Sequence, residues 1–345
     1  MKSISVLSRH SYAKHHGRNF SNISALLVKE LREKSGAPMM DCKKALAAAD
    51  VNGDINKAMD WLRAKGISRV TSAVDRLAAE GLIILHTNES DNCAVLVEVN
   101  SETDFVGRNK QFQEFAAIVA ATASKATAND KGYIDVEKLL HSTPIIPSEF
   151  KNITQHKILN DTLGDIVTTI REKIVINRAM QIKASDKTII NGYVHGKVGT
   201  EFLPSHIQMG KSAAIVTISS DSSIHSNELQ VIIKDMTKKL AMHIVATNPL
   251  YLRPELVPAD VVEKEKKICK EQLDNLGNKA PKPDMLEKVL MGKLNKKLAE
   301  ICLVGQNHVA EEGAPIVSKY VSDFSKKHSL SINIENYAKW DIGSS

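Results

Sequence analysis

The hydrophobic positions between residues 23 and 66 recur at helical spacing and predict a three-helix unit. Leu27 and Leu31 fall on one face of the first helix, and further helices are predicted over 39–49 and 54–65. Glycine and proline residues separate these segments. Because a unit of about 40 residues buries only a marginal core, we expect it to pack against a neighbour or a partner.

Beyond this unit the pattern alternates between short strands and longer helices. The apolar runs 82–86 and 93–99, joined by a polar segment, are typical of a β-hairpin. A helix follows, with Phe112 and Phe115 on its apolar face. Residues 124–160 contain no regular pattern, so we expect them to be irregular.

The second half of the chain has the same order of strands followed by a helix. Two charged amphipathic helices come after it, and a turn cluster between them predicts an antiparallel helical hairpin. The chain closes with a helix and a strand. The predicted strands are 174–183, 189–195, 213–219 and 330–337, and the predicted helices are 161–172, 227–246, 259–276, 284–300 and 316–327.

This order predicts an α+β fold, in which a three-helix unit precedes two related α+β core subdomains. Identity between the two core segments is too weak to establish a repeat. The predicted organisation is a leader at 1–22, the three-helix unit at 23–66, a helical linker at 67–80, core subdomains at 81–160 and 161–338, the latter with a hairpin insertion at 259–300, and a tail at 339–345.

The formal net charge of +6 is concentrated near the N-terminus. Residues 1–29 contain five Lys or Arg and no Asp or Glu, and the first 22 residues include five Ser. This composition is typical of an organellar transit peptide, although a basic tail without a targeting role would have the same charge. We therefore interpret the basic excess as a targeting signal, and not as a nucleic-acid-binding surface.

The chain contains no motif of a known catalytic site. Walker phosphate-loop, GxGxxG, HExxH and GxSxG patterns are absent, and no CxxC pair occurs among the four cysteines. The cysteine spacing favours reduced thiols over a zinc site or a catalytic thiol. No run of 18 apolar residues is present. We therefore expect no catalytic residue, cofactor or metal, and no direct nucleic-acid, membrane or small-molecule ligand.

One loop, residues 102–106, places an aromatic between charged residues directly after a predicted strand. In one interpretation Thr103 or Asp104 caps the next helix, expected over 108–120, and Phe105 packs on its first turn. In the other, Phe105 projects and inserts into a partner. Burying a Phe side chain is worth about 1.5–3 kcal/mol, so a gain available in only one partner conformation would favour that conformation about 10- to 100-fold.

Two longer segments resemble a known family. LLVKELREKSGAPMMDCKKAL at 26–46 and LVEVNSETDFVGRN at 96–109 are similar to the two signatures of translation elongation factor Ts. Weaker matches, KLAMHIVATNPLYL at 239–252 and VVEKEKKI at 261–268, follow in the family's order. With its acid-free leader, the chain resembles a mitochondrial member of this family.

The resemblance implies guanine-nucleotide exchange on mitochondrial elongation factor Tu, a GTPase of the matrix, by a protein with no chemistry of its own. It also implies that the three-helix unit has a fold like the ubiquitin-associated (UBA) domain and docks on the GTPase domain. Asp104 and Phe105 match the family residues that push between two helices of the GTPase beside its magnesium site. The implied partner-binding residues are Lys29, Arg32, Met39, Met40, Thr103, Asp104, Phe105, Val106 and His243, the last near the partner's phosphate loop.

The chain departs from the family's pattern at two places. Gly107 stands where Ala is usual, which leaves the rigidity of the loop open, and Asn307-His308 replaces the usual Pro-Phe. Two other functions stay possible at this point. The three-helix unit alone would suit a ubiquitin-binding adaptor, which leaves the 102–106 loop unexplained, and the basic leader alone would suit an organellar RNA-binding factor.

Overall fold

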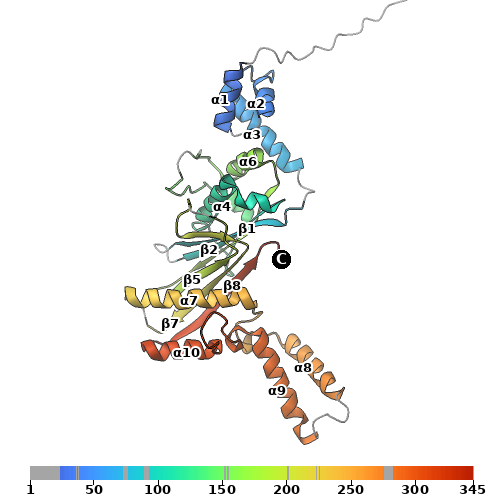
Figure 1. Ribbon diagram of the computed structural model, residues 1–345, viewed down its shortest axis with the longest axis vertical. Helices are drawn as coiled ribbons and strands as arrows, with labels where there is room; N and C mark the ends of the chain where they lie inside the picture. Colours follow the sequence, from blue (N-terminus) through green and yellow to red (C-terminus); the bar gives the residue numbers. More distant parts are fainter. Residues whose placement is uncertain are drawn as a thin grey trace, which may run out of the picture. The chain divides into compact units, whose positions relative to one another are not determined.

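The computed structural model describes two compact units, which divide between Arg69 and Val70 (Figure 1). The predicted leader at 1–22 lies outside the described residues. The structure describes residues 24–35, 37, 39–72, 77–88, 93–150, 153, 155–199, 202–222, 224, 226–275 and 283–344.

The first unit consists of helices α1 (Ala25–Ser35), α2 (Met39–Leu46) and α3 (Ile55–Ser72). Asp54 caps α3, since its carboxylate accepts hydrogen bonds from two backbone N–H groups of the first turn, at 2.8 and 3.0 Å. Helix α3 continues into the segment where a separate linker helix was expected, and residues 77–79 have no regular structure. The buried side chains of this unit are Val28, Leu31, Ala37, Cys42, Ala45, Leu46, Val51, Ala58 and Leu62.

The second unit contains two antiparallel sheets, which confirms the α+β class. One is five-stranded with the order β3-β4-β2-β1-β6, and the other is three-stranded with the order β5-β7-β8. The strands are β1 (Glu80–Asn88), β2 (Cys93–Ser101), β3 (Tyr133–Ile134), β4 (Ile174–Lys183), β5 (Thr188–His195), β6 (Ile207–Gly210), β7 (Ser212–Ser220) and β8 (Ile332–Asp341).

The sheets divide the core differently from the predicted split at residue 160. Strands β4 and β6 come after that position, yet both pair in the first sheet, β4 with β2 and β6 with β1. The reason lies in β2, which is buried along all nine of its residues. A buried strand needs a hydrogen-bonding neighbour on each edge, and only the return of the chain at β4 supplies the second.

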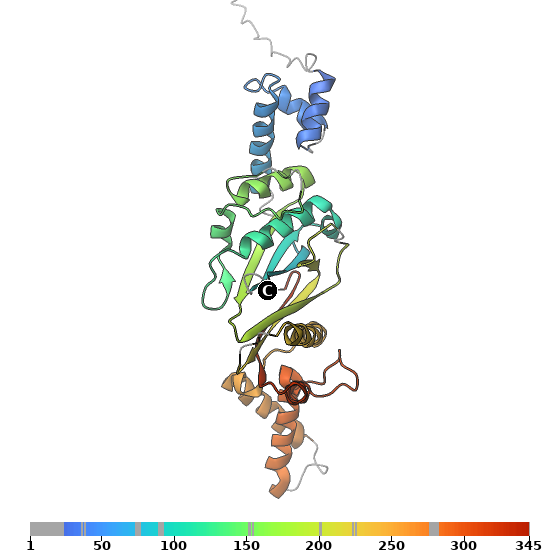
Figure 2. The same ribbon diagram turned by 90° about the vertical axis from the view of Figure 1, so that its left-hand side faces the viewer.

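The two sheets form the middle layers of a four-layer arrangement. Leu82 and Ile84 of β1 face helix α4 (Lys110–Ala123), whereas Ile83 and Leu85 face the second sheet. In the second sheet Ala213 and Ile215 point inward, while Ala214 and Val216 pack on α7 (Asn227–Thr247). Figure 2 shows α7 end-on, on the side of the sheets away from α4.

The remaining helices lie around these layers. Within the stretch expected to be irregular, the chain forms β3 and the short helix α5 (Val136–Leu140), and α6 (Leu159–Ile170) follows. Helices α8 (Ala259–Asp274) and α9 (Pro283–Ile301) pack on each other through Leu273 and Leu290, and α10 (Val317–His328) precedes β8. None of the helices in the described residues is long and apolar enough to span a membrane.

Candidate partner-binding site

The chain leaves β2 through a 3-10 turn, Asp104–Arg108, which presents one aromatic side chain to solvent. Phe105 is 76% exposed, whereas its neighbour Val106 is buried in the core beside Leu82. Phe105 therefore does not pack on the first turn of α4, and that interpretation was wrong. Val106 is placed as an anchor of the turn, with little surface for a partner to contact.

Helix α4 has its own cap, which separates it from the exposed turn. The side-chain oxygen of Asn109 accepts hydrogen bonds from the backbone N–H groups of Gln111, at 2.8 Å, and Phe112, at 3.3 Å. The expectation that Thr103 or Asp104 caps this helix was therefore wrong. Thr103 and Asp104 instead belong to the turn that precedes the helix.

Hydrogen bonds from distant parts of the chain hold the turn. The carboxylate of Glu172 accepts from the Thr103 backbone N–H at 2.9 Å and from its hydroxyl at 2.8 Å. The hydroxyl of Ser101 donates to the Thr103 carbonyl, and the Gln113 amide donates to the Gly107 carbonyl, both at 2.9 Å. Glu172 could not be identified from the sequence, because 69 positions separate it from Thr103.

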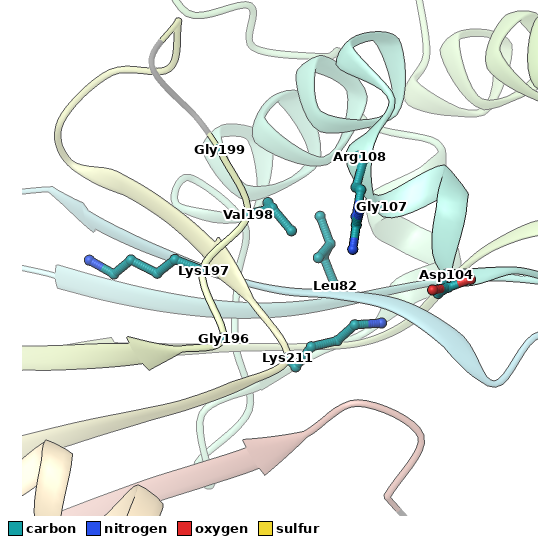
Figure 3. Close-up of a pocket in the computed structure, with 9 residues that line it drawn as sticks. All are labelled: Leu82, Asp104, Gly107, Arg108, Gly196, Lys197, Val198, Gly199 and Lys211. Carbon is teal, nitrogen blue, oxygen red and sulfur yellow. The ribbon is translucent and has the colours of Figure 1, made fainter.

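A pocket of about 390 Å³ lies beside the turn (Figure 3). It is lined by Asp104 and Arg108 from the turn and by Lys197 and Lys211 from the region around β6. Lys211 is paired with Glu80 at 2.8 Å and extends in the direction of Asp104, whereas Lys197 extends away from the pocket. The surface beside Phe105 is therefore concave and carries both signs of charge.

His243 is fully buried in α7, although the resemblance implied contact with a partner. Its Nδ1 accepts a hydrogen bond from the Val309 backbone N–H at 3.3 Å, so Nε2 carries the proton and lies 3.0 Å from the Gln306 Oε1. The imidazole of His308, which lies at one of the two places where the chain departs from the family's pattern, packs beside it, with 5.1 Å between the two ring centroids. Burial and the neighbouring His308 lower the His243 pKa from 6.5 to about 4.

This environment gives His243 a different role from the expected one. A neutral, buried imidazole that bonds to both ends of residues 306–309 ties that segment to α7. Direct contact between its side chain and a partner is not available in this conformation, since none of its surface is exposed. We therefore regard His243 as a residue that positions 306–309.

In the first unit the four candidate residues are exposed at α1 and the start of α2. Lys29 and Arg32 are exposed on α1. Met39 and Met40 are 57% and 62% exposed, so they do not pack into the helical core. Two adjacent exposed methionines form an adaptable apolar surface, because the thioether chain is flexible and polarisable.

The described residues contain no group of three or more His, Cys, Asp or Glu side chains placed to hold a metal ion. All four cysteines are buried and none forms a disulfide. The geometry therefore offers an exposed aromatic on a held turn, a concave polar surface beside it, and a separate apolar surface on the three-helix unit.

Known proteins resemble the chain along most of its length. The family model for elongation factor TS matches residues 102–344. The elongation factor Ts of Nitratiruptor sp. is 36% identical over 321 residues, 93% of each chain. Those of Nautilia profundicola and Paramagnetospirillum magneticum are each 35% identical, over 94% of this chain and 94% and 92% of their own. The chain belongs to the elongation factor Ts family.

Proposed function

We propose that the chain is a guanine-nucleotide exchange factor for the GTPase elongation factor Tu and acts in translation elongation. The observation that carries this proposal is Phe105, which is 76% exposed at a turn directly after the buried strand β2. Its turn lies within the segment that resembles the family's second signature. An exposed aromatic on a held turn suits insertion into a second protein.

The proposed mechanism is displacement of the elements that hold GDP. A P-loop GTPase binds GDP through backbone N–H groups, a lysine and Mg²⁺. Phe105 enters between two helices of the GTPase, with Asp104 beside it, and moves the groups that organise Mg²⁺. Loss of that cation removes the largest local positive charge, and GDP leaves.

The coupling between GDP and the exchange factor is reciprocal. If the factor weakens GDP binding a thousandfold, which corresponds to about 4 kcal/mol, GDP weakens binding of the factor equally. GTP then rebinds and releases the factor, which acts repeatedly without catalysing a chemical step. No residue of the chain needs to bond covalently to the nucleotide.

The first unit supplies a second contact in this proposal. Lys29 and Arg32 provide positive charge, and Met39 and Met40 provide apolar surface, for docking on the GTPase domain. Such a three-helix unit resembles the UBA type. Separate attachment lets the turn at Phe105 act while the factor stays bound.

The proposed location is the mitochondrial matrix. Support comes from the leader composition alone, because the relatives named with organisms are bacterial. Residues 1–29 fused to a fluorescent protein should direct it to mitochondria, and a fusion that starts at residue 23 should not. A reporter that stays in the cytosol in both cases would contradict the proposal.

Release of fluorescent GDP tests the exchange function. Elongation factor Tu is loaded with the labelled nucleotide, the chain is added, and release is followed over time. We expect acceleration by the wild type and slower release with Phe105→Ala at an unchanged melting temperature. Unaccelerated release would contradict exchange, and binding of the chain to ubiquitin or RNA in the same preparation would favour one of the alternatives.

A further inference from the structure

We propose that Glu172 is a positioning residue for exchange, which fixes the backbone that carries Phe105. This inference rests on the proposed function and adds a residue to it. Glu172 lies between α6 and β4, and its carboxylate reaches the turn after β2. It touches neither nucleotide nor partner in this proposal and acts only through Thr103.

The contact between Glu172 and Thr103 uses every donor that Thr103 has. One carboxylate oxygen accepts the backbone N–H at 2.9 Å and the other accepts the hydroxyl at 2.8 Å. Hydrogen bonds to an ionised carboxylate are stronger than neutral ones. Because one rigid group binds both donors, it fixes the direction of the chain two residues before Phe105.

A second bond runs between the same two segments in the opposite sense. The carboxylate of Glu102 accepts the backbone N–H of Lys173 at 2.6 Å. Each segment therefore supplies one acid that binds the backbone of the other, at adjacent positions. The backbone conformation is compatible with these two reciprocal hydrogen bonds. Arg171, at the end of α6, has a left-handed φ of 68° and turns the chain toward residues 102 and 103.

The turn is also held on the far side of Phe105. Val106 is buried, and the Gln113 amide binds the Gly107 carbonyl at 2.9 Å. The backbone of Phe105 thus lies between two fixed points while its ring stays 76% exposed. A loop ordered before binding avoids the entropy loss that a loose loop would suffer on insertion.

Substitutions at Glu172 separate positioning from a simple charge effect. Glu172→Ala removes both acceptors. Glu172→Gln loses the charge but can still accept from the backbone N–H and donate to the hydroxyl oxygen of Thr103. A positioning role therefore predicts rescue by Gln, whereas attraction between the Glu172 charge and the partner predicts that Gln and Ala behave alike. Glu335→Ala, an exposed carboxylate on β8, is the matched control.

The test measures GDP release against factor concentration with the full chain. We expect Glu172→Ala to lower the maximal release rate about tenfold with a half-saturating concentration changed less than about threefold, because docking is intact. Glu172→Gln should recover most of the rate, and Glu335→Ala should match the wild type. Adding Glu172→Ala to Phe105→Ala should change the rate less than about twofold, since both act through the same ring.

Amide hydrogen exchange of the free chain supplies a readout that needs no partner. Glu172→Ala should speed exchange at 103–106 and leave α4 unchanged; if that variant does not fold, Thr103→Val, which loses only the hydroxyl bond, takes its place. Unchanged protection at 103–106, a wild-type release rate in Glu172→Ala, equal defects in the Gln and Ala variants, or independent effects of Glu172 and Phe105 would each overturn the inference. A wild-type chain that does not accelerate release contradicts the proposed function instead, and the amide experiment still decides the role of Glu172.

Discussion

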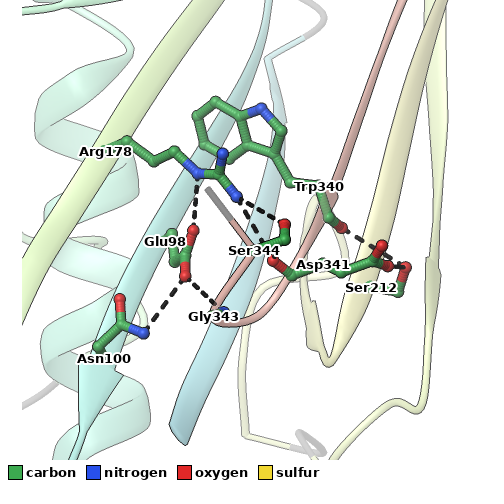
Figure 4. Close-up of polar contacts among 8 residues, drawn as sticks. All are labelled: Glu98, Asn100, Arg178, Ser212, Trp340, Asp341, Gly343 and Ser344. Carbon is green, nitrogen blue, oxygen red and sulfur yellow. Dashed lines mark hydrogen bonds and ion pairs between the residues drawn. The ribbon is translucent and has the colours of Figure 1, made fainter. Parts of the chain in front are cut away.

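The guanidinium of Arg178 lies over the ring of Trp340, 4.5 Å from its centroid, and this cation–π contact joins β4 of one sheet to β8 of the other. The same guanidinium donates from Nε to the carboxylate of Glu98 at 2.7 Å (Figure 4). Glu98 is fully buried and also accepts from the Gly343 backbone N–H at 2.9 Å. The buried acid therefore joins β4 to the turn that follows β8, and Arg178 makes the contact with the second sheet.

Removal of the cation should destabilise the second unit strongly. Arg178→Met leaves the Glu98 carboxylate buried without its charged partner, and we expect a loss of about 3–5 kcal/mol in the free energy of unfolding. Urea denaturation at pH 7 measures it. Lys297→Met, which breaks an exposed pair with Glu300 at 3.5 Å, is the control and should cost less than about 1 kcal/mol. Equal losses would contradict the role assigned to Arg178.

Stability should fall in mild acid because of His243. Its folded-state pKa of about 4 lies below the unfolded value of 6.5, so the folded chain binds fewer protons between these pH values. The contribution of neutral His243 to the free energy of unfolding is complete above pH 6.5. It is lost as the pH falls toward 4, by up to about 3 kcal/mol. Urea denaturation at steps from pH 4.5 to 7.5 should show this slope, and His243→Gln should reduce it, while His308, whose pKa is also lowered by burial, continues to contribute. If the substitution leaves the dependence of the free energy of unfolding on pH unchanged, a group other than His243 causes it.

Alanine at position 107 should stabilise the exposed turn. A Cβ on Gly107 would lie 3.4 and 3.6 Å from two carbons of Leu82, which is ordinary contact. Gly107→Ala should therefore raise the free energy of unfolding by about 0.4–1 kcal/mol, since it restricts the unfolded chain. Gly81→Ala is the contrast: its φ is +129° and the new Cβ would lie 2.1 Å from the Val99 carbonyl oxygen. Thermal denaturation should show opposite shifts for the two variants.

The two exposed methionines should contribute to affinity without contributing to stability. Met39→Ala with Met40→Ala removes apolar surface that is 57% and 62% exposed in the free chain, so unfolding should be unchanged. Burial of such side chains on a partner predicts a loss of about 10- to 100-fold in affinity for elongation factor Tu. Titration calorimetry measures the affinity. Met285→Ala, at a 52% exposed position of α9, is the control, and an equal effect there would contradict a specific surface at α2.

Long elements were predictable from local pattern, and their pairing was not. The runs 82–86 and 93–99 were predicted as a hairpin and lie in the paired strands β1 and β2, and the helix expected over 227–246 is α7. The short β3, β6 and α5 escaped because two to five residues carry too little periodicity. The pairing of β4 with β2 depends on the burial of both faces of β2. That burial arises only when the layers of the fold are assembled, so the local pattern does not predict it.

The candidate site likewise contains features that could be predicted from the sequence and features that could not. The place of Phe105 directly after a strand left two alternatives open, packing on the next helix or exposure, and its 76% exposure in the folded chain decides between them. Burial of His243 could not be foreseen, because α7 is covered by residues 306–309 as well as by a sheet. Glu172 carries no local signal, since its partner Thr103 is 69 positions away.

The burial of β2 has a mechanical consequence. This strand is covered on both faces and hydrogen-bonded on both edges, so it belongs to the part of the molecule that opens last. Phe105 is thus mounted on a stiff base only four residues beyond the end of β2. In the proposed insertion of Phe105 between two helices of the GTPase, the strand behind Phe105 would not deform to relieve the force on the ring. The helices of the GTPase would then move apart instead. A flexible support for Phe105 would remove this effect, because the turn would deform in their place.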